Sequence, residues 1–284
     1  MYRKTQSCAV AIFQCAVNLF DEWVSPPRAP FGGVQCDVDC SQQELGFLLS
    51  CITAFIDRRC GKSLTIKTAP TCYHPNSHNL LHSCYEQNGF PAVETHSNHF
   101  IPVDSDSFAK KVHPAEKRRL FKCKNAGYTI GSGKKIELEK AYSFLTHCRN
   151  QADYKIPLSL CQVTQLACQL PEHLLLFGVF DADKMIALSI SLKVSDDILY
   201  NFLVADLREY RTFSPVVMLT ETIYEFCQQQ NISILDLGIS VDENGNPKPS
   251  LTRFKKNIGG QACEKVTYEK FFGKVDLFSA VQNS

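Results

Sequence analysis

The chain has 284 residues, 44% of them hydrophobic and 21% charged, so it can form one large domain or two smaller domains with a real core. The formal net charge is only +1, which excludes a strong global attraction to nucleic acid or to a membrane surface. We expect no DNA partner. The longest apolar runs are too short to cross a bilayer, so no transmembrane segment is expected either.

The fourteen cysteines have irregular spacings, form no CxxC pair and lie mostly in apolar segments such as "LGFLLSCITAF". Cysteine is often buried as a small apolar residue, so this usage predicts reduced core thiols in a cytoplasmic protein. The opening "MYRKTQSCAVAIFQCAVNLFDEW" places basic residues before an apolar stretch, as a signal peptide does. Gln14 and Asn18 interrupt that stretch, and we expect one or two strands there.

The first half continues with "SQQELGFLLSCITAFIDRRCGKSLTIKTAP", which predicts a helix, a glycine stop and a strand. A polar loop and a short helix, "NLLHSCYEQNGF", follow. His78 and His82 are spaced i, i+4 and could share a helix face as zinc ligands. The possible ligands around them are Cys72, His74, Cys84, His96 and His99. Their spacing matches no standard zinc finger, and we expect no metal.

A basic segment, "FAKKVHPAEKRRLFKCKNAGYTI", lies between the two halves. Pro114 suits a helix start and Gly127 a helix stop. The helix carries five cations: Lys117, Arg118, Arg119, Lys122 and Lys124. It is either a solvated linker or a cationic wall beside a site.

The second half begins with two predicted helices, over 138–150 and 159–170. The stretch "LLLFGVFDADKMIALSISLKVSDDILYNFLVA" then holds three apolar runs. Turn signals at Asp181–Lys184 and Asp196–Asp197 separate these runs, which predicts an antiparallel meander.

A helix and a strand follow the meander. Ser214 is a typical N-cap and Pro215 suits the first helical position, while Asn231 can close the helix. The run "ISILDLGIS" predicts a strand parallel to "ILYNFLVA" through a right-handed crossover. A short helix, "LTRFKKN", then ends at Gly259–Gly260, and the last strands are expected within Glu264–Phe272.

The order of helix, strand, polar loop, short helix and glycine occurs in both halves. From helix start to final glycine the distance is about 45 residues in each, over Glu44–Gly89 and Ser214–Gly259, which suggests two copies of one unit.

The meander, helix, strand and short helix in this order resemble the GNAT N-acyltransferase superfamily. "SPPRAPFGG", "HPAEKRRLFKCKNAG" and "DLGIS…LTRFKKNIGG" are similar to Fem-type proteins, which carry two GNAT-like domains and include aminoacyltransferases of cell-wall synthesis. The resemblance covers roughly Ser25 to Phe272. It implies an α+β fold with two GNAT-like domains whose mixed central sheets are flanked by helices. The expected parts are a shortened domain at 1–110, a basic linker helix at 111–130 and a second domain at 131–284.

This resemblance implies transfer of an acyl group from acetyl-CoA or another acyl-CoA to a small-molecule amine or a peptidoglycan-precursor-like acceptor. In GNAT enzymes a glycine-rich loop before the helix holds the coenzyme pyrophosphate. The matching positions here are 211–215 and contain no glycine; Phe213 is expected to limit close approach, and Pro215 lacks an N–H. The cofactor contacts implied are Arg211, Thr212, Ser214 and Leu203. Without the glycine loop two alternatives stay open: an aminoacyl-tRNA donor, or a non-catalytic binding protein.

Amine acylation needs a proton acceptor and a donor to the oxyanion. A backbone N–H of the strand 198–204 is the implied oxyanion donor. Asp236 is a polar residue in the next strand and either caps or bonds nearby backbone or acts as a base or substrate anchor. Asn201 and Tyr210 are further catalytic candidates. The candidate substrate contacts are Ser240, Tyr200 and Lys255.

Overall fold

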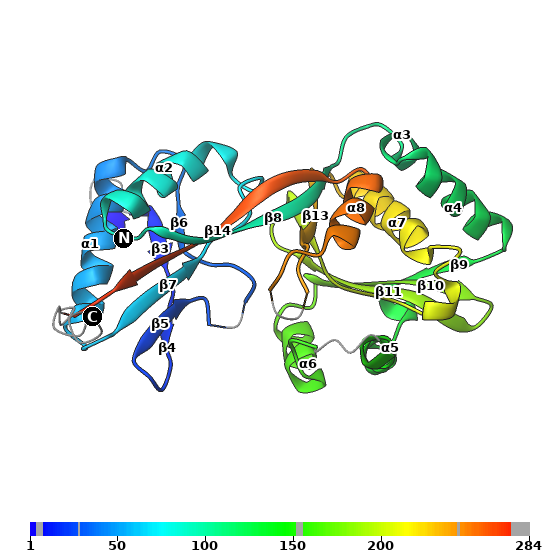
Figure 1. Cartoon of the computed structure of the whole chain (residues 1–284), viewed down its shortest axis with the longest axis horizontal. Helices are drawn as coiled ribbons and strands as arrows, with labels where there is room; N and C mark the ends of the chain where they lie inside the picture. Colours follow the sequence, from blue (N-terminus) through cyan, green and yellow to red (C-terminus); the bar gives the residue numbers. More distant parts are fainter. Residues whose placement is uncertain (4–7, 28, 152–155, 243–244, 274–284) are drawn as a thin grey trace, which may run out of the picture. The chain divides into compact units, whose positions relative to one another are not determined.

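The computed structural model describes residues 1–3, 8–27, 29–151, 156–242 and 245–273. The chain forms two compact units (Figure 1). Unit 1 comprises Met1–His96 together with Glu264–Ser284, and unit 2 comprises Ser97–Cys263. Each unit has its own hydrophobic core.

The main sheet of unit 1 has the strand order β4–β5–β7–β14. Its strands are β4 (Ala16–Val17), β5 (Glu22–Ser25), β7 (Ser63–Lys67) and β14 (Gln261–Phe271). β5 and β7 are parallel, whereas β4 and β14 run antiparallel to their neighbours. Two small antiparallel ladders complete the strands of this unit: β1 (Tyr2–Arg3) with β2 (Cys8–Ala9), and β3 (Ala11–Phe13) with β6 (Val34–Cys36).

Two helices belong to unit 1, α1 (Gln42–Asp57) and α2 (Pro75–Gln87). α1 begins at a capping box, in which Ser41 accepts from the Glu44 N–H and the Glu44 carboxylate accepts from the Ser41 N–H. Buried leucines of α1 pack in the core with Tyr85 of α2 and Tyr268 of β14, whose rings are 4.6 Å apart.

The sheet of unit 2 has the order β8–β13–β12–β11–β10–β9. Its strands are β8 (Ala92–Pro102), β9 (Thr129–Ser132), β10 (Leu174–Asp181), β11 (Lys184–Lys193), β12 (Ile198–Asp206) and β13 (Ile234–Ile239). β10, β11 and β12 form the predicted antiparallel meander, and β12 and β13 form the predicted parallel pair. β8 pairs antiparallel with β13.

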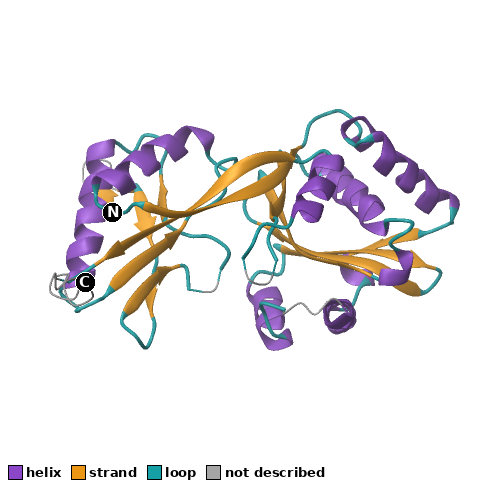
Figure 2. Ribbon diagram, viewed as in Figure 1, coloured by secondary structure: helices purple, strands orange, loops and turns teal. Residues whose placement is uncertain are grey.

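Helices flank both faces of this sheet (Figure 2). They are α3 (Phe108–Lys111), α4 (Pro114–Asn125), α5 (Leu138–Gln151), α6 (Leu160–Gln169), α7 (Pro215–Gln229) and α8 (Pro249–Asn257). Two short 3-10 helices, η1 (Gly133–Lys135) and η2 (Arg208–Tyr210), precede α5 and α7. α7 packs on β10 to β13 and also contacts α4, so the expected basic helix belongs to unit 2. The architecture is therefore α+β, with mixed sheets flanked by helices.

The same connection occurs in both units. α1 joins the parallel strands β5 and β7, and α7 joins the parallel strands β12 and β13. The helix that follows ends near a left-handed glycine in each case, Gly89 after α2 and Gly259 after α8. The units divide at His96/Ser97 and Cys263/Glu264. The tandem interpretation, with boundaries at 1–110, 111–130 and 131–284, stays a prediction.

The expectation that the cysteines lie mostly in the core needs correction. All fourteen cysteines are free thiols, but only five are buried, and Cys51, Cys60, Cys161 and Cys168 are exposed. Cys51 lies in α1 and Cys161 and Cys168 lie in α6, whereas Cys60 lies in the turn after α1. Among the described residues, no helix combines the length and apolar character needed to cross a membrane.

Candidate active site

Unit 2 contains a gap between two parallel strands. β12 and β13 pair only from Ile198–Ile234 to Tyr200–Asp236, although both strands continue beyond that point. Beyond this point β12 remains paired with β11 on its other side, and β13 remains paired with β8 on its other side. Backbone groups between the separating ends are therefore no longer used by the β12–β13 ladder.

A cavity of about 370 Å³ lies at this separation. Its residues come from β12, β13, the start of α7, and α8: Asn201, Val204, Asp206, Arg211, Ser214, Val216, Thr220, Leu237, Leu251, Phe254, Lys255 and Ile258. Six of these twelve residues are apolar and six are polar or charged, so the cavity offers both an apolar wall and groups that can orient a small molecule. Four predicted site residues meet here: Asn201, Arg211, Ser214 and Lys255.

Lys255 of α8 is the buried cation of the cavity. Its side chain turns toward β13, where Nζ donates to the carbonyl oxygens of Gly238 at 2.9 Å and Ile239 at 2.7 Å. The residue is only 7% exposed. Burial lowers the pKa of its amine to about 8, while the negative charge of Asp236 acts in the opposite direction.

Asp236 is fixed in the interior beside the cavity. Its Oδ1 accepts from Asn98 Nδ2 at 2.7 Å and from the Gly238 N–H at 2.8 Å. The residue is 1% exposed and is not part of the cavity wall. A buried carboxylate held by two donors can keep its charge and stabilise a neighbouring ammonium. The geometry thus favours the backbone-bonding alternative for Asp236.

Asn201 lies on an irregular part of β12. Ile190 pairs with Leu203, but Leu192 pairs with Tyr200, so β12 has an additional residue there. Such a bulge turns backbone groups away from the ladder. The Asn201 Oδ1 accepts hydrogen bonds from the hydroxyls of two β11 residues, Ser189 and Ser191. Its Nδ2 has no acceptor among the described residues and is a free donor at the cavity wall.

The start of α7 forms another part of the wall. Ser214 occupies the N-cap position, as predicted, but it does not cap as predicted: its φ is +58° and its side chain makes no cap hydrogen bond. The turn from Tyr210 sets this geometry, because the Ser214 N–H donates to the carbonyl oxygens of Tyr210 and Arg211. The Val216 N–H has no acceptor within the described chain, so it is left for an anion at the helix N-terminus.

Arg211 is paired within the cavity. Its guanidinium donates to both carboxylate oxygens of Asp206, at 3.1 and 3.4 Å. Phe213, expected to obstruct this place, is not part of the cavity wall. Its ring contacts Tyr128 at 5.4 Å and lies under Lys122 of α4.

The other predicted residues are outside the cavity wall. Tyr210 donates to Asp181 at 2.8 Å, which raises the pKa of its phenol. Thr212 is exposed, and Leu203 is a core side chain. Tyr200 pairs with Asp236 at the last rung before the strands separate, and burial raises the pKa of its phenol. Ser240, just after β13, is buried, and its Oγ has no hydrogen-bond partner among the residues that the structure describes.

Several residues of this region were not predicted. Asp206 neutralises Arg211, and Asn98 holds Asp236. His99 is fully buried, and within the described part of the chain neither ring nitrogen has a hydrogen-bond partner. Burial together with Lys255 and Lys256 lowers the pKa of its imidazole. The sequence did offer one sign of a polar site here. The two serines in the apolar run "ALSISL" share one face of a strand, and both hydroxyls bond Asn201.

The histidine-rich segment lies in unit 1. The rings of His78 and His82 stack at 6.1 Å, and His82 Nδ1 is 2.7 Å from the Tyr268 hydroxyl. In the part of the chain that the structure describes, no three His, Cys, Asp or Glu residues gather as metal ligands.

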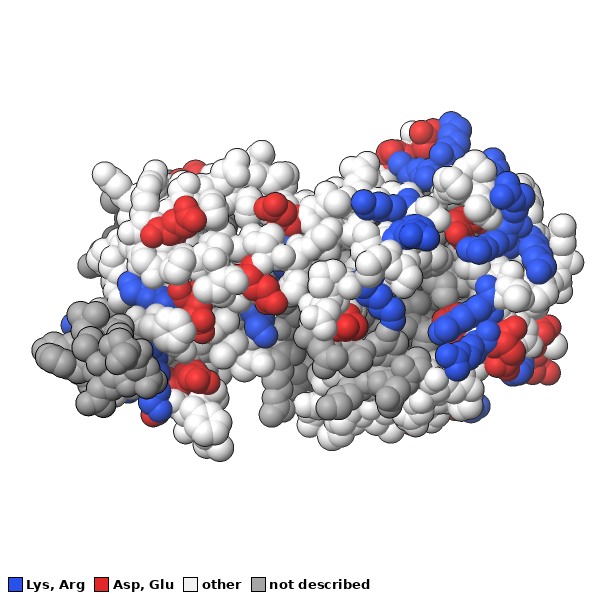
Figure 3. Space-filling model, viewed as in Figure 1, with Lys and Arg blue, Asp and Glu red and all other residues white. Residues whose placement is uncertain are grey.

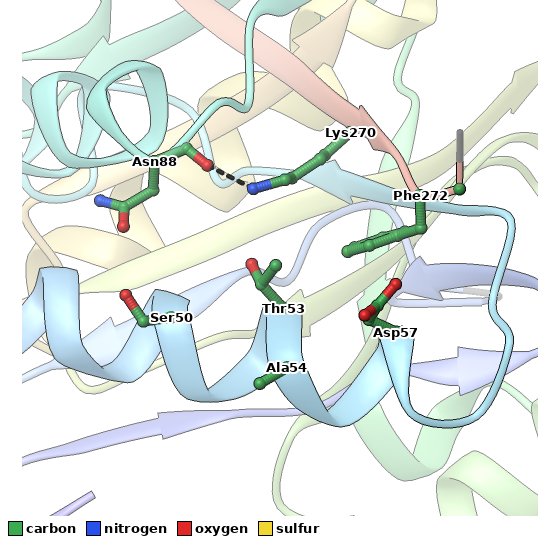
Figure 4. Close-up of a pocket in the computed structure, with 8 residues that line it drawn as sticks. Ser50, Thr53, Ala54, Asp57, Asn88, Lys270 and Phe272 are labelled. Carbon is green, nitrogen blue, oxygen red and sulfur yellow. Dashed lines mark hydrogen bonds between the residues drawn. The ribbon is translucent and has the colours of Figure 1, made fainter. Parts of the chain in front are cut away.

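Unit 1 has a cavity of about 440 Å³ between α1 and the end of β14. Figure 4 shows Lys270 reaching across it to the Asn88 carbonyl, 2.7 Å away, with Thr53 and Asp57 of α1 on the opposite wall. Burial lowers the pKa of Lys270. None of the predicted site residues lies in this cavity.

The chain matches no protein-family model, and its sequence matches no curated protein. Solved structures do share its fold. FemX has a TM-score of 0.67 at 11% identity, over 87% of this chain and 83% of that chain. L-PGS from Bacillus licheniformis has a TM-score of 0.61 at 9% identity, over 94% and 82%. The tandem GNAT protein from the clavulanic acid biosynthesis pathway has a TM-score of 0.55 at 10% identity, over 95% and 81%. The chain thus has a GNAT-type, Fem-like fold. Because fold alone does not fix function, its activity must be argued from the cavity.

Proposed function

We propose that the cavity of unit 2 transfers an activated acyl group to an amine, with Lys255 as the proton acceptor. One observation carries this proposal: a buried amine on a cavity wall whose pKa is about 8. A general base works best when its pKa is near the working pH. The fold of the solved structures named above is consistent with such a reaction.

The hydrogen bonds of Lys255 suit this role. A neutral amine can donate its two hydrogens to the carbonyls of Gly238 and Ile239 and keep its lone pair for the attacking amine. The nitrogen of the acceptor amine then bonds to the acyl carbon, and a proton moves from this nitrogen to Nζ of Lys255. The bond to the leaving sulfur or oxygen breaks, and that atom takes up a proton. Asp236 positions this exchange through its charge and does not contact the substrate.

Asn201 supports the proposal from the other strand. Its Nδ2 is a free donor, and the serine hydroxyls of β11 fix the orientation of the amide. An amide N–H directed at a developing oxyanion stabilises the transition state. We therefore propose that the acyl carbonyl lies between Asn201 and Lys255.

For the donor we first propose acyl-CoA. The α7 N-terminus, with the Val216 N–H and the Ser214 hydroxyl, can receive one phosphate, and the helix dipole favours negative charge there. Arg211 is the cation of this wall, and to bind phosphate its guanidinium must give up its hydrogen bonds to Asp206. The acceptor is a small-molecule amine or a peptidoglycan-precursor-like amine.

A second donor, aminoacyl-tRNA, is favoured by a separate observation. Arg211 is already neutralised, whereas α4 carries cations directly beside the helix start, where Lys122 lies over the Phe213 ring at 4.2 Å. Lys117 and Arg118 of α4 have no ion-pair partner among the described residues. Figure 3 shows Lys and Arg side chains gathered over α3 and α4. Cationic side chains of this kind bind a phosphate backbone.

The test is binding followed by turnover. Acetyl-CoA and a charged tRNA are titrated calorimetrically, acetyl-CoA up to about 1 mM, the upper end of common KM values. The acylated amine is then detected by mass spectrometry, because the fourteen free thiols would react with a thiol reagent. Saturable binding of one donor and loss of turnover in Lys255→Met are expected. Binding of neither donor would favour the non-catalytic alternative.

A further inference from the structure

The hairpin between β4 and β5 in unit 1 ends in exposed apolar side chains. Leu19 is 98% exposed and Phe20 is 68% exposed, and Val17 beside them is half exposed. Figure 1 shows this hairpin projecting from the sheet of unit 1. Large apolar side chains grouped on a projecting turn are typical of an interaction surface.

The turn is held in one shape by Asn18. Its Oδ1 accepts from the N–H groups of Phe20 at 2.8 Å and Glu22 at 3.1 Å, and its Nδ2 donates to the Glu22 carboxylate at 2.8 Å. Its backbone N–H donates to the Glu22 carbonyl, and its carbonyl accepts from the Asp21 N–H. The exposed pair is thus presented by a fixed turn, which lowers the entropy that insertion would cost.

The base of the hairpin carries aromatic and cationic groups. Trp23 packs edge-on against Phe55 of α1, with ring centres 5.8 Å apart. The Arg59 guanidinium stacks over the Phe55 ring, 4.2 Å from the ring centre. Neither Arg58 nor Arg59 has a carboxylate partner among the described residues, while Lys62 lies 3.8 Å from Asp21. Trp23 at the base of the hairpin thus contacts the end of α1, which carries the guanidinium groups of Arg58 and Arg59.

We infer that this hairpin docks on a phospholipid bilayer, with Leu19 and Phe20 inserted at the headgroup–acyl boundary. A convex apolar tip needs a matching pocket in a protein partner, but a bilayer accepts it without one. Aromatic side chains prefer the interfacial layer, and guanidinium groups pair with lipid phosphates. Binding is peripheral and reversible, because two inserted side chains bury little area. This inference is independent of the transferase site.

The chain provides its own probe, because Trp23 is its only tryptophan. The full chain is mixed with vesicles of phosphatidylcholine, or of phosphatidylcholine with phosphatidylglycerol, and Trp23 emission is recorded. We expect a blue shift, quenching by lipids brominated near the headgroup, and stronger partitioning into the anionic vesicles. Vesicle cosedimentation gives the partition coefficient directly.

The test variant is Leu19→Ser/Phe20→Ser, and its control is Leu170→Ser/Phe121→Ser, which removes the same residue types from exposed positions of unit 2. The tip variant should lose at least about tenfold in partition coefficient, and the control should lose little. Arg58→Gln/Arg59→Gln should weaken only the binding to anionic vesicles. No blue shift, or equal partitioning of the tip variant and wild type, would overturn the inference. So would a concentration-dependent dimer that disappears in the tip variant without any vesicle binding, since a second copy would then cover the tip.

Discussion

Lys255 decides how the proposed reaction depends on pH. Its pKa of about 8 means that the neutral, proton-accepting form grows as the pH rises through 8. We predict that turnover rises with pH around that midpoint. Lys255→Met should lower kcat by roughly 10²–10⁴-fold and abolish this dependence, because general-base catalysis contributes about that factor. The measurement is a pH–rate profile with saturating donor.

Lys255→Arg keeps the charge but cannot accept a proton, so it is the matched control. Turnover that falls above pH 8 in wild type would contradict the base role and favour the ammonium as a donor. Stability gives a readout without activity. The folded-state pKa is below the ordinary value of 10.5, so the folded state releases this proton first and gains stability as the pH rises from about 8 toward 10.5. In Lys255→Met this gain should be absent from urea unfolding curves.

The ion pair between Arg211 and Asp206 sets how strongly the cavity can bind an anion. The guanidinium now donates to both Asp206 oxygens, so a phosphate must compete with that carboxylate. Arg211→Ala should weaken acetyl-CoA binding by about tenfold or more, because a charge-assisted hydrogen bond contributes about 1.5–3 kcal/mol. Asp206→Asn should strengthen binding several-fold by releasing the guanidinium. Calorimetric titration at fixed ionic strength measures both changes.

The matched control is Arg208→Ala, which removes an exposed arginine of η2 that does not line the cavity. Its affinity should equal that of wild type at the same salt concentration. If Arg211→Ala also binds like wild type, Arg211 is not a phosphate ligand.

At the scale of the element, the bend in β13 shapes the cavity. Asp236 pairs with Phe100 of β8, but Gly238 pairs with His99, so Leu237 is an additional residue in β13. Gly238 has a φ of +75°, and an added Cβ would lie 3.3 Å from the Tyr200 ring. The glycine therefore permits both the bulge and the close packing of Tyr200.

Gly238→Ala should lower the free energy of unfolding by about 1–2 kcal/mol from the left-handed backbone alone, with a further loss from the Tyr200 contact. Gly127→Ala is the control, since its φ is +78° and nothing lies within 4 Å of its added Cβ. Urea unfolding of the two variants separates backbone strain from packing. Equal losses would mean that the Tyr200 contact contributes nothing.

The elements themselves were largely predictable from the sequence. Apolar spacing, Pro215 and Asn231 predicted α7, and the turn signals predicted the meander. The left-handed Ser214 was not predictable, because the preceding turn imposes it and serine normally caps with an extended backbone. The bulges in β12 and β13 were also not predictable, since they exist only as a difference in register between paired strands.

The candidate site was predictable in part for a similar reason. Polar residues within apolar strands pointed to Asn201 and Asp236, whereas Lys255 of α8 was named only as a candidate substrate contact. Their partners come from distant parts of the chain, as Asn98 does for Asp236, 138 positions away in the sequence. A single sequence gives no signal for such pairs, so the proposal of Lys255 as the base needed the geometry.

At the scale of the whole molecule, folding of each unit depends on one of the two long strands, β8 and β14. β8 follows α2 of unit 1, yet its residues from Asn98 onward pair with β13 in unit 2. β14 follows α8 of unit 2, yet its residues from Thr267 onward pair with β7 in unit 1. Each sheet is therefore completed by a strand that follows a helix of the other unit. The β7 edge in unit 1 therefore has no partner strand until β14 has been synthesised.

This exchange predicts the effect of shortening the chain. Truncation after Cys263 removes most of β14, including the buried Val266 and Tyr268, and leaves the edge of β7 unpaired. Each lost side chain contributes about 1.5–3 kcal/mol of burial, a large share of the about 5–15 kcal/mol that stabilises a typical domain. Unit 1 should lose its cooperative unfolding, and the emission of Trp23 should shift to the red. Truncation after Gly273 keeps the whole of β14 and should leave both signals unchanged. A cooperative Trp23 transition in the chain ending at Cys263 would show that unit 1 folds without the exchanged strand.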